Sequence, residues 1–231
     1  MTAEPVPQVS STAADTVSPT TTREPGWTAA LRERLARMLP ITELLPTRQP
    51  AYVASWVYVF GVVTIAALVW VLISGTVLAF FGAAWWHISP IGHFFNSIHF
   101  WSVQMFFIFM VLHLWGQFWG AGWRDGRART WMVGVVIFLV SVVTAFTGYL
   151  VQQNFDSQWI AVNAKDAVNG TGLGGLFNVT NFGQQYGLHV MLFPIGVTLL
   201  VVLHIIQVRS RGVVRPIGDP GQADDAGRAS T

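Results

Sequence analysis

The sequence contains no cysteine and few charged residues. Without cysteine the chain can form neither disulfides nor thiolate metal sites, and no haem can be attached to it through thioether bonds. Charged residues make up 10% of the chain and hydrophobic residues 52%, whereas about a quarter of an average soluble domain is charged. We also expect no cleavable signal peptide, because the N-terminus lacks a charged start followed by an apolar core. The composition is that of a membrane protein.

Long apolar runs are abundant instead. Four of them reach the roughly 20 residues that span a bilayer, at about 53–81, 98–120, 131–151 and 187–208. All but one of the 13 Lys and Arg residues lie before the first span, between the second and third, or after the fourth. With four spans these regions share one side, which the positive-inside rule makes cytoplasmic. We therefore expect an all-α, four-helix bundle in the plasma membrane, with both termini in the cytoplasm.

The segments outside the spans differ in composition. Residues 1–25 and 217–231 are predicted to be disordered tails around a domain at 26–216. Just before the first span, leucine and arginine alternate at helical spacing, which predicts an amphipathic helix in the cytoplasmic interface or a solvated helix against a partner subunit. The long connection at 152–185 contains NGTGLGG, and we expect short helices in it near 157–168.

Four histidines lie inside two of the spans. His99 and His113 stand at positions i and i+14 of the second span, and His189 and His204 at positions i and i+15 of the fourth. An ionisable residue inside a span is energetically costly and marks a functional candidate, although a single one can simply be hydrogen-bonded to a neighbouring helix. At 3.6 residues per turn, each pair lies on one helix face with a rise of about 21 to 22 Å.

The two histidine-bearing helices run in the same direction, so they offer two rings at each of two depths. His99 and His189 are predicted to meet near the outer surface, and His113 and His204 near the inner surface. Each matched pair can supply both axial ligands of one haem b. A zinc or copper site fits less well, because it requires three or four ligands that converge at one depth.

Four glycines repeat the i, i+14 spacing in the other two spans. Gly61 and Gly75 have this spacing in the first span, and Gly134 and Gly148 have it in the third. A helix backbone can approach a flat haem closely only where no Cβ intrudes. The alternatives are that small residues merely allow helices to pack, or that a haem-free bundle or transporter matches these spacings by accident. The combined pattern predicts two b haems inside the bundle.

These features resemble the N-terminal, dihaem half of cytochrome b, most closely the split form, cytochrome b6. The resemblance covers about residues 28–216. Its local matches are RARTWMVGVVIFLVSVVTAFTGY at 127–149, YGLHVMLFPIGVTLLVVLHIIQVRSRG at 186–212 and SQWIAVN at 157–163. The combination of i, i+14 histidines in one helix with i, i+15 histidines in the other also resembles the split form.

The sequence departs from the family pattern at several positions. Residues 152–155 read QQNF where the family has a Pro-Trp-containing tetrapeptide beside its quinol-oxidation site. Phe100 replaces the arginine that usually contacts a haem propionate, whereas Arg127 matches the arginine near the inner haem. Ala67 aligns with the cysteine that holds an extra haem in the split form, so no covalent c-type haem is expected.

The resemblance implies a subunit that carries electrons across the membrane between quinol and quinone sites of a cytochrome bc-type quinol oxidoreductase, coupled to proton translocation. It would not be catalytic alone. The implied partners are a second-half cytochrome b subunit resembling subunit IV, a Rieske iron–sulfur protein and a c-type cytochrome or other acceptor, with lipid and quinone but no nucleic acid. The alternative is a dihaem membrane anchor that relays electrons between quinone and a peripheral dehydrogenase or reductase, and residues 152–155 favour it. His87 and His93 are interpreted as interfacial side chains or, alternatively, as groups for proton transfer or propionate contact.

Overall fold

The computed structural model describes residues 26–38 and 56–214. The tails predicted at 1–25 and 217–231 lie outside the described residues. The chain divides into two units, Met1–Ile41 and Thr42–Thr231, and each is described by itself. In the first unit, α1 (Gly26–Met38) forms the helix expected before the first span, with Trp27 and Leu31 exposed. Its location in the membrane interface stays a prediction.

The second unit contains four long apolar helical segments, each long enough to cross a membrane. They are α3 (Trp56–Phe81), α5 (Pro90–Trp119), α6 (Ala128–Leu150) and a continuous segment made of α8 (Phe182–Gly187), the π-helical turn η2 (Leu188–Leu192) and α9 (Phe193–Arg211). Helix is the conformation expected of such segments, because in hydrocarbon each backbone N–H and C=O must be bonded within its own segment. The described residues contain no strand. The predicted all-α, four-span fold is confirmed.

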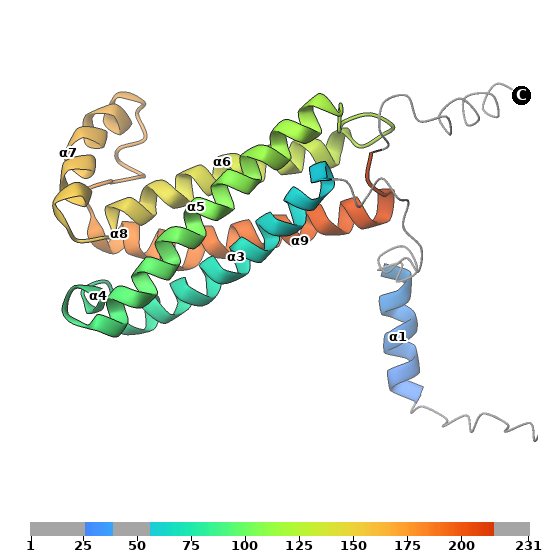
Figure 1. The fold of residues 1–231 in the computed structure, drawn as a ribbon, viewed down its shortest axis with the longest axis horizontal. Helices are drawn as coiled ribbons and strands as arrows, with labels where there is room; N and C mark the ends of the chain where they lie inside the picture. Colours follow the sequence, from blue (N-terminus) through green and yellow to red (C-terminus); the bar gives the residue numbers. More distant parts are fainter. Residues whose placement is uncertain (1–25, 39–55, 215–231) are drawn as a thin grey trace, which may run out of the picture. The chain divides into compact units, whose positions relative to one another are not determined.

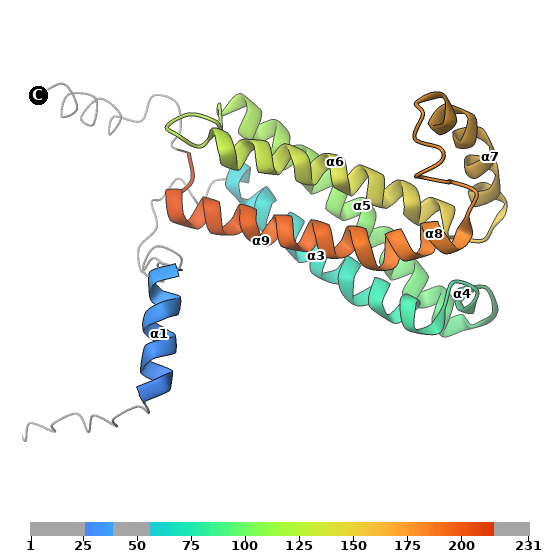
Figure 2. The same ribbon diagram turned by 180° about the vertical axis from the view of Figure 1, so that it is seen from behind.

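The four long helices run lengthwise through the bundle, with α3 packed against α5 and α6 against α9 (Figures 1 and 2). The short helices α4 (Trp85–Ile88) and α7 (Phe155–Gly170) lie at one end, and the α5–α6 loop lies at the other. We name these the outer and the inner end, following the predicted orientation. The pairing brings a glycine-bearing helix beside a histidine-bearing helix on each side of the bundle.

Two helices at the outer end begin with clear sequence signals. α5 starts at Pro90, ahead of the predicted span, where the Ser89 hydroxyl accepts a hydrogen bond from the Gly92 N–H. A Cβ on Gly92 would come within 2.7 Å of the Trp86 Cα, so only glycine lets α5 and α4 approach this closely. α7 extends slightly beyond the helix expected near 157–168, and Asn154 caps its first turn.

The buried apolar core lies at mid-depth. It consists of Ala67, Leu68, Phe106, Met110 and Val197. Leu68 lies midway along α3 between its two glycines, and Phe106 lies midway along α5 between its two histidines. This apolar layer therefore separates the two depths at which the histidines occur.

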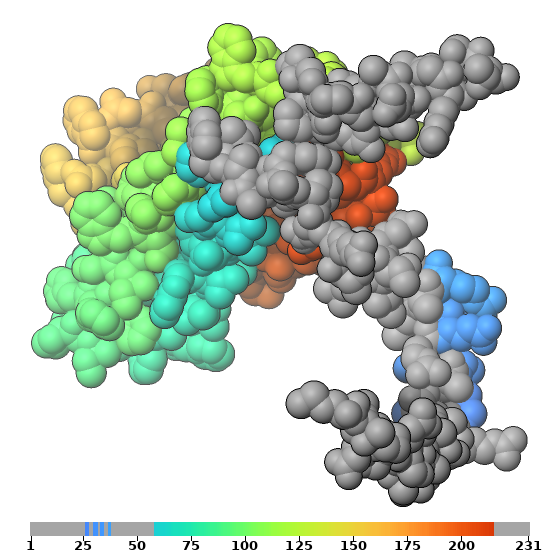
Figure 3. All heavy atoms as spheres, turned by 45° about the vertical axis from the view of Figure 1, so that its right-hand side comes forward, coloured from blue at the N-terminus to red at the C-terminus, as the bar shows by residue number. Residues whose placement is uncertain are grey.

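The exposed surface along the sides of the bundle is apolar. Large side chains such as Val62, Trp70 and Trp101 are more than half exposed, and Figure 3 shows one face formed by α3 and α5. Exposed apolar area of this extent is what lipid or a partner subunit covers in a membrane-spanning protein.

Candidate functional site

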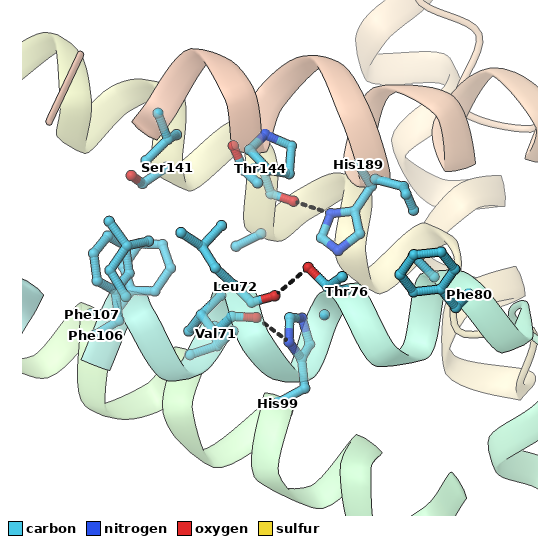
Figure 4. Close-up of a pocket in the computed structure, with 18 residues that line it drawn as sticks. Val71, Leu72, Thr76, Phe80, His99, Phe106, Phe107, Ser141, Thr144 and His189 are labelled. Carbon is cyan, nitrogen blue, oxygen red and sulfur yellow. Dashed lines mark hydrogen bonds between the residues drawn. The ribbon is translucent and has the colours of Figure 1, made fainter. Parts of the chain in front are cut away.

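The structure brings His99 of α5 and His189 opposite each other near the outer end. Their ring centres are 6.3 Å apart and the ring planes are almost perpendicular, at 89°. Figure 4 shows the two rings facing each other across a cavity. A metal bound by one nitrogen of each imidazole at about 2 Å keeps the two ring centres roughly 6 Å apart. The observed separation therefore fits two axial ligands of one iron.

Hydrogen bonds fix the orientation of both outer rings. Nδ1 of His99 lies 3.1 Å from the Val71 carbonyl oxygen and 3.1 Å from the Ser74 hydroxyl. Nδ1 of His189 lies 3.0 Å from the Thr144 carbonyl oxygen and 3.3 Å from the Thr147 hydroxyl. A carbonyl can only accept, so Nδ1 carries the hydrogen and Nε2 keeps its lone pair. Each ring is thus in the tautomer that binds a metal through Nε2.

Two cavities adjoin the outer pair. The larger has a volume of about 390 Å³ and is lined mainly by apolar side chains. Its polar lining residues include His99, His189, Ser141 and Thr144. The second, of about 170 Å³, lies toward the outer end and shares both histidines. Its other polar lining residues are Asn96, Gln104, Tyr149, Gln152 and Tyr186, and none of its lining residues carries a full charge. A largely apolar cavity with a few oriented polar groups is typical of a cofactor site.

Each of the four predicted glycines lies against one of the four histidines. A Cβ on Gly75 would come within 3.0 Å of Cε1 of His99, and one on Gly148 within 2.7 Å of Cε1 of His189. At the inner level the corresponding distances are 3.1 Å from Gly61 to His113 and 3.3 Å from Gly134 to His204. The glycines therefore make room for the imidazole rings themselves, in addition to the predicted approach of a haem.

The inner histidines differ from the outer pair in their hydrogen bonding. The Nδ1 atoms of His113 and His204 are buried and have no well-aligned hydrogen-bond partner among the described residues. The glycine contacts nevertheless bring both rings to the same level as Gly61 and Gly134. Across residues 26–38 and 56–214, no three His, Asp or Glu side chains gather as a metal-binding group. Two imidazoles at each level, with a glycine behind each ring, fit the axial ligand set of a haem.

Sequence reasoning missed the hydroxyl groups that orient the outer rings. Ser74 directly precedes Gly75, and Thr147 directly precedes Gly148. The inner glycines follow Phe60 and Val133, which have no hydroxyl. A hydroxyl residue followed by glycine at one depth only was therefore a readable signal of the difference between the two levels.

Arg127 lies at the inner end, where its guanidinium group binds backbone carbonyls. Nε donates to the Gly212 oxygen at 3.1 Å and Nη2 to the Arg211 oxygen at 2.9 Å. Nη1 lies 3.4 Å from the Asp125 carboxylate. These bonds join the α5–α6 loop to the end of α9, and the predicted contact of Arg127 with an inner haem stays a prediction.

The remaining predicted positions lie at the outer end. The His87 ring stacks on Trp86, and its Nε2 lies 2.9 Å from the Gln152 carbonyl oxygen. His93 meets Trp86 edge-on. Both histidines are exposed, and neither lines the two cavities. Phe100 lines the smaller cavity.

A comparison with protein families matches residues 104–226 to the family described as "Cytochrome b(N-terminal)/b6/petB". A cytochrome b of Schizosaccharomyces octosporus is 29% identical over 192 residues, which cover 74% of this chain and 49% of that protein. A cytochrome b6 of Heliomicrobium gestii is 25% identical over 190 residues, which cover 73% of this chain and 89% of that protein. The chain spans half or less of the fungal cytochromes b that it matches.

Among solved structures, the chain is similar to a chain of "Hyperthermophilic respiratory Complex III". The TM-score is 0.60 at 22% identity, and the match covers 84% of this chain and 55% of that one. At this identity the likeness concerns the fold. Together with the four apolar helices, these similarities indicate a multi-pass membrane protein.

Proposed function

The chain belongs to the cytochrome b N-terminal/b6 family, which implies b-type haem, and on this premise we propose that it binds two haems and carries electrons across the membrane. The quinol and quinone sites that it connects would be those of a cytochrome bc-type quinol oxidoreductase, coupled to proton translocation. One observation carries the proposal: paired histidines recur at two depths, and each ring lies against a glycine.

Haem b, when bound, supplies one-electron redox chemistry. His99 and His189 would hold the outer haem through Nε2, while Val71 and Thr144 keep the hydrogen on Nδ1. His113 and His204 would hold the inner haem. Arg127 is proposed to serve the inner level as well, by fastening the end of α9.

The residues between the two levels would keep water out of the path between the haems. The i, i+14 spacing corresponds to a rise of about 21 Å along an α-helix, which is the separation expected between the two ligand levels. Leu68, Phe106 and Val197 fill the layer between them and are less than a tenth exposed. In such an apolar layer an electron can pass between fixed centres while protons and ions are excluded.

The partners and location follow from the same proposal. We infer a second-half cytochrome b subunit, a Rieske iron–sulfur protein and a c-type cytochrome or other acceptor, because the chain belongs to the cytochrome b N-terminal/b6 family and is similar in fold to a chain of a respiratory Complex III. The positive-inside rule supports a plasma-membrane protein with both termini in the cytoplasm. Ala67, together with the lack of cysteine, supports the absence of a covalent c-type haem.

A dihaem anchor for a peripheral dehydrogenase or reductase is a second candidate. The observation in its favour is the QQNF segment at 152–155, where Asn154 serves as the N-cap of α7. In the family, the tetrapeptide at these positions lies beside the quinol-oxidation site. Here a helix cap takes its place, which favours a function without quinol oxidation at that site. Quinol-dependent reduction of a Rieske protein in the isolated complex supports the first candidate, whereas electron exchange with a co-purified dehydrogenase and no Rieske partner supports the second.

The ligand assignment is tested by His99→Ala and His113→Ala in the full-length chain. Each variant is expected to lose one haem and keep the other, because the apolar layer separates the two levels. Haem content per chain and redox titration of the reduced-minus-oxidised spectrum measure both effects. His93→Ala is the matched control, since it removes an exposed histidine of the same helix and is expected to leave both haems. Full haem content with both potentials unchanged in His99→Ala and His113→Ala would refute the assignment.

A further inference from the structure

The paired glycines and histidines of the four long helices do not all have the same separation in sequence. The glycine pairs of α3 and α6 and the histidine pair of α5 all have the i, i+14 spacing, but His189 and His204 are separated by one residue more. Each residue of a regular α-helix turns the chain by about 100°. In a regular helix, the extra residue would rotate His204 by that angle relative to the direction it needs.

The extra residue falls in a π-helical turn. In η2 (Leu188–Leu192), which contains His189, the N–H of Phe193 bonds to the carbonyl of Leu188, at position i−5 instead of i−4. A turn closed in this way holds one residue more than an α-helical turn and adds no further turn. The i, i+15 separation therefore rotates the chain about as much as i, i+14 does in a regular α-helix.

The position of the π turn has a cause in the sequence. Pro194 closely follows it and has no N–H to bond the carbonyl at position i−4, that of Val190. The proline ring also collides with that carbonyl in a regular α-helix, which makes the preceding turn the place where the helix departs from α geometry. Pro194 thus fixes the wide turn at the outer histidine, ahead of the regular helix that leads to His204.

The glycine–histidine contacts at both levels agree with the absorption of one residue by the π turn. The glycines of α6 have the i, i+14 spacing, yet Gly148 lies against the ring of His189 and Gly134 against the ring of His204. Histidines at i and i+15 can make both contacts only if one residue is absorbed between them. The same contacts on the other side of the bundle join two helices that both have the i, i+14 spacing.

We propose that η2, anchored by Pro194, is the register element of the fourth span: it absorbs one residue so that His189 and His204 face His99 and His113 at the same two levels. The proposal rests on the proposed two-haem function. It makes Pro194 a positioning residue, which acts through the direction of the His189 ring.

Two single-residue deletions in the full-length chain test the proposal. Met191 lies in the π turn and Leu199 lies in the regular part of α9, and both side chains are exposed. Either deletion shortens the histidine spacing of the fourth span to i, i+14. Deletion of Met191 converts the π turn to α-helix and is expected to keep both haems. Deletion of Leu199 leaves the π turn in place, turns His204 away by about 100° and is expected to lose the inner haem.

Haem content per chain, the midpoint potential of each haem and electron paramagnetic resonance of the oxidised haems are the measurements. The resonance reports the angle between the two ligand rings, so it detects a turned His189 even where the haem is retained. Full retention of haem in both deletions overturns the proposal, because residue number alone, without an anchored turn, would then set the register. Equal loss of haem in both deletions overturns it as well when Pro194→Ala does not restore haem to the Met191 deletion.

A further variant guards against misfolding of the Met191 deletion. In that deletion the carbonyl at position i−4 from Pro194 becomes that of His189, which the proline ring would meet in a regular helix. Combining the deletion with Pro194→Ala removes this collision and is expected to restore both haems. Loss of haem in the combined variant overturns the proposal. A wild-type chain with fewer than two haems contradicts the proposed function instead, and the register proposal with it.

Discussion

Among single residues, Gly148 makes the tightest of the four glycine–histidine contacts. A Cβ added there would lie 2.7 Å from Cε1 of His189, and the ring is held in place by its bond to the Thr144 carbonyl. We expect Gly148→Ala to push the ring off its line toward His99 and to weaken outer haem binding. Overpacking of this kind typically costs about 1–3 kcal/mol. Haem content and the potential of the outer haem measure the effect.

Two other glycines provide the controls for Gly148. Gly196 has nothing within 4 Å of an added Cβ, so Gly196→Ala is expected to leave both haems unchanged. Gly134→Ala meets His204 at 3.3 Å and is expected to have a smaller effect, confined to the inner haem. Outer haem retention in Gly148→Ala equal to that in Gly196→Ala would contradict the contact argument.

Among the helices, α7 depends on its first turn. The Asn154 side chain accepts from the Ser157 N–H at 2.8 Å, and the Ser157 hydroxyl accepts from the Asn154 N–H at 3.0 Å. We expect Asn154→Ala to destabilise α7 by about 1 kcal/mol, the usual effect of removing an N-cap. Amide hydrogen exchange should accelerate about five- to tenfold in the first turns of α7.

Matched substitutions separate the cap from a general effect on α7. Asn154→Asp keeps an acceptor at the N-cap and should preserve slow exchange. Asn163→Ala removes an exposed asparagine from the middle of the same helix, where its side chain donates to the Trp159 carbonyl. If Asn163→Ala accelerates exchange as much as Asn154→Ala, the capping interpretation fails.

The helices also show what could be predicted from the sequence. Apolar length located all four spans, because a bilayer imposes one minimum length on every crossing helix. It missed the first turns of α5, where Asn96 and Ser97 interrupt the apolar run, although Ser89 and Pro90 mark a helix start. The histidine spacing predicted that His99 and His189 would meet, but the glycine spacing was interpreted as room for a haem and did not predict the contacts of the glycines with the histidine rings. Which carbonyl receives each Nδ1 hydrogen depends on the packing of neighbouring helices, which no spacing encodes.

Over the whole bundle, the two ends are held together differently. At the outer end, hydrogen bonds orient the histidine rings directly, and two cavities adjoin them. At the inner end, Nδ1 of neither ring has a well-aligned hydrogen bond among the described residues, and further hydrogen bonds join the surrounding segments to one another. Arg127 bonds to the carbonyls that end α9, Arg211 bonds back to the Gly126 carbonyl, and Tyr58 of α3 bonds to the Val214 carbonyl. The inner level therefore depends on the arrangement of whole segments.

Removal of Arg127 should loosen this inner end. Arg127→Ala breaks its bonds to the Gly212 and Arg211 carbonyls, and hydrogen bonds of a charged group contribute about 1.5–3 kcal/mol. We expect the thermal midpoint to fall by several degrees and the inner haem to dissociate more readily, with the outer haem unaffected. Arg129→Ala, which removes an exposed arginine from the first turn of α6, is the control and should leave the thermal midpoint unchanged.

Arg127→Lys distinguishes fastening of the segments from the predicted contact with a haem. A lysine keeps the positive charge but lacks the planar fork that reaches both carbonyls at once. If Arg127 fastens the inner end, the lysine variant should lose thermal stability almost as much as the alanine variant. If its charge acts on the inner haem, the lysine variant should keep the wild-type potential while the alanine variant lowers it, because a nearby positive charge favours the reduced state. Thermal unfolding and redox titration of the two variants measure these effects separately. An unchanged thermal midpoint in both variants would contradict the conclusion that Arg127 stabilises the inner end through its bonds to the Gly212 and Arg211 carbonyls.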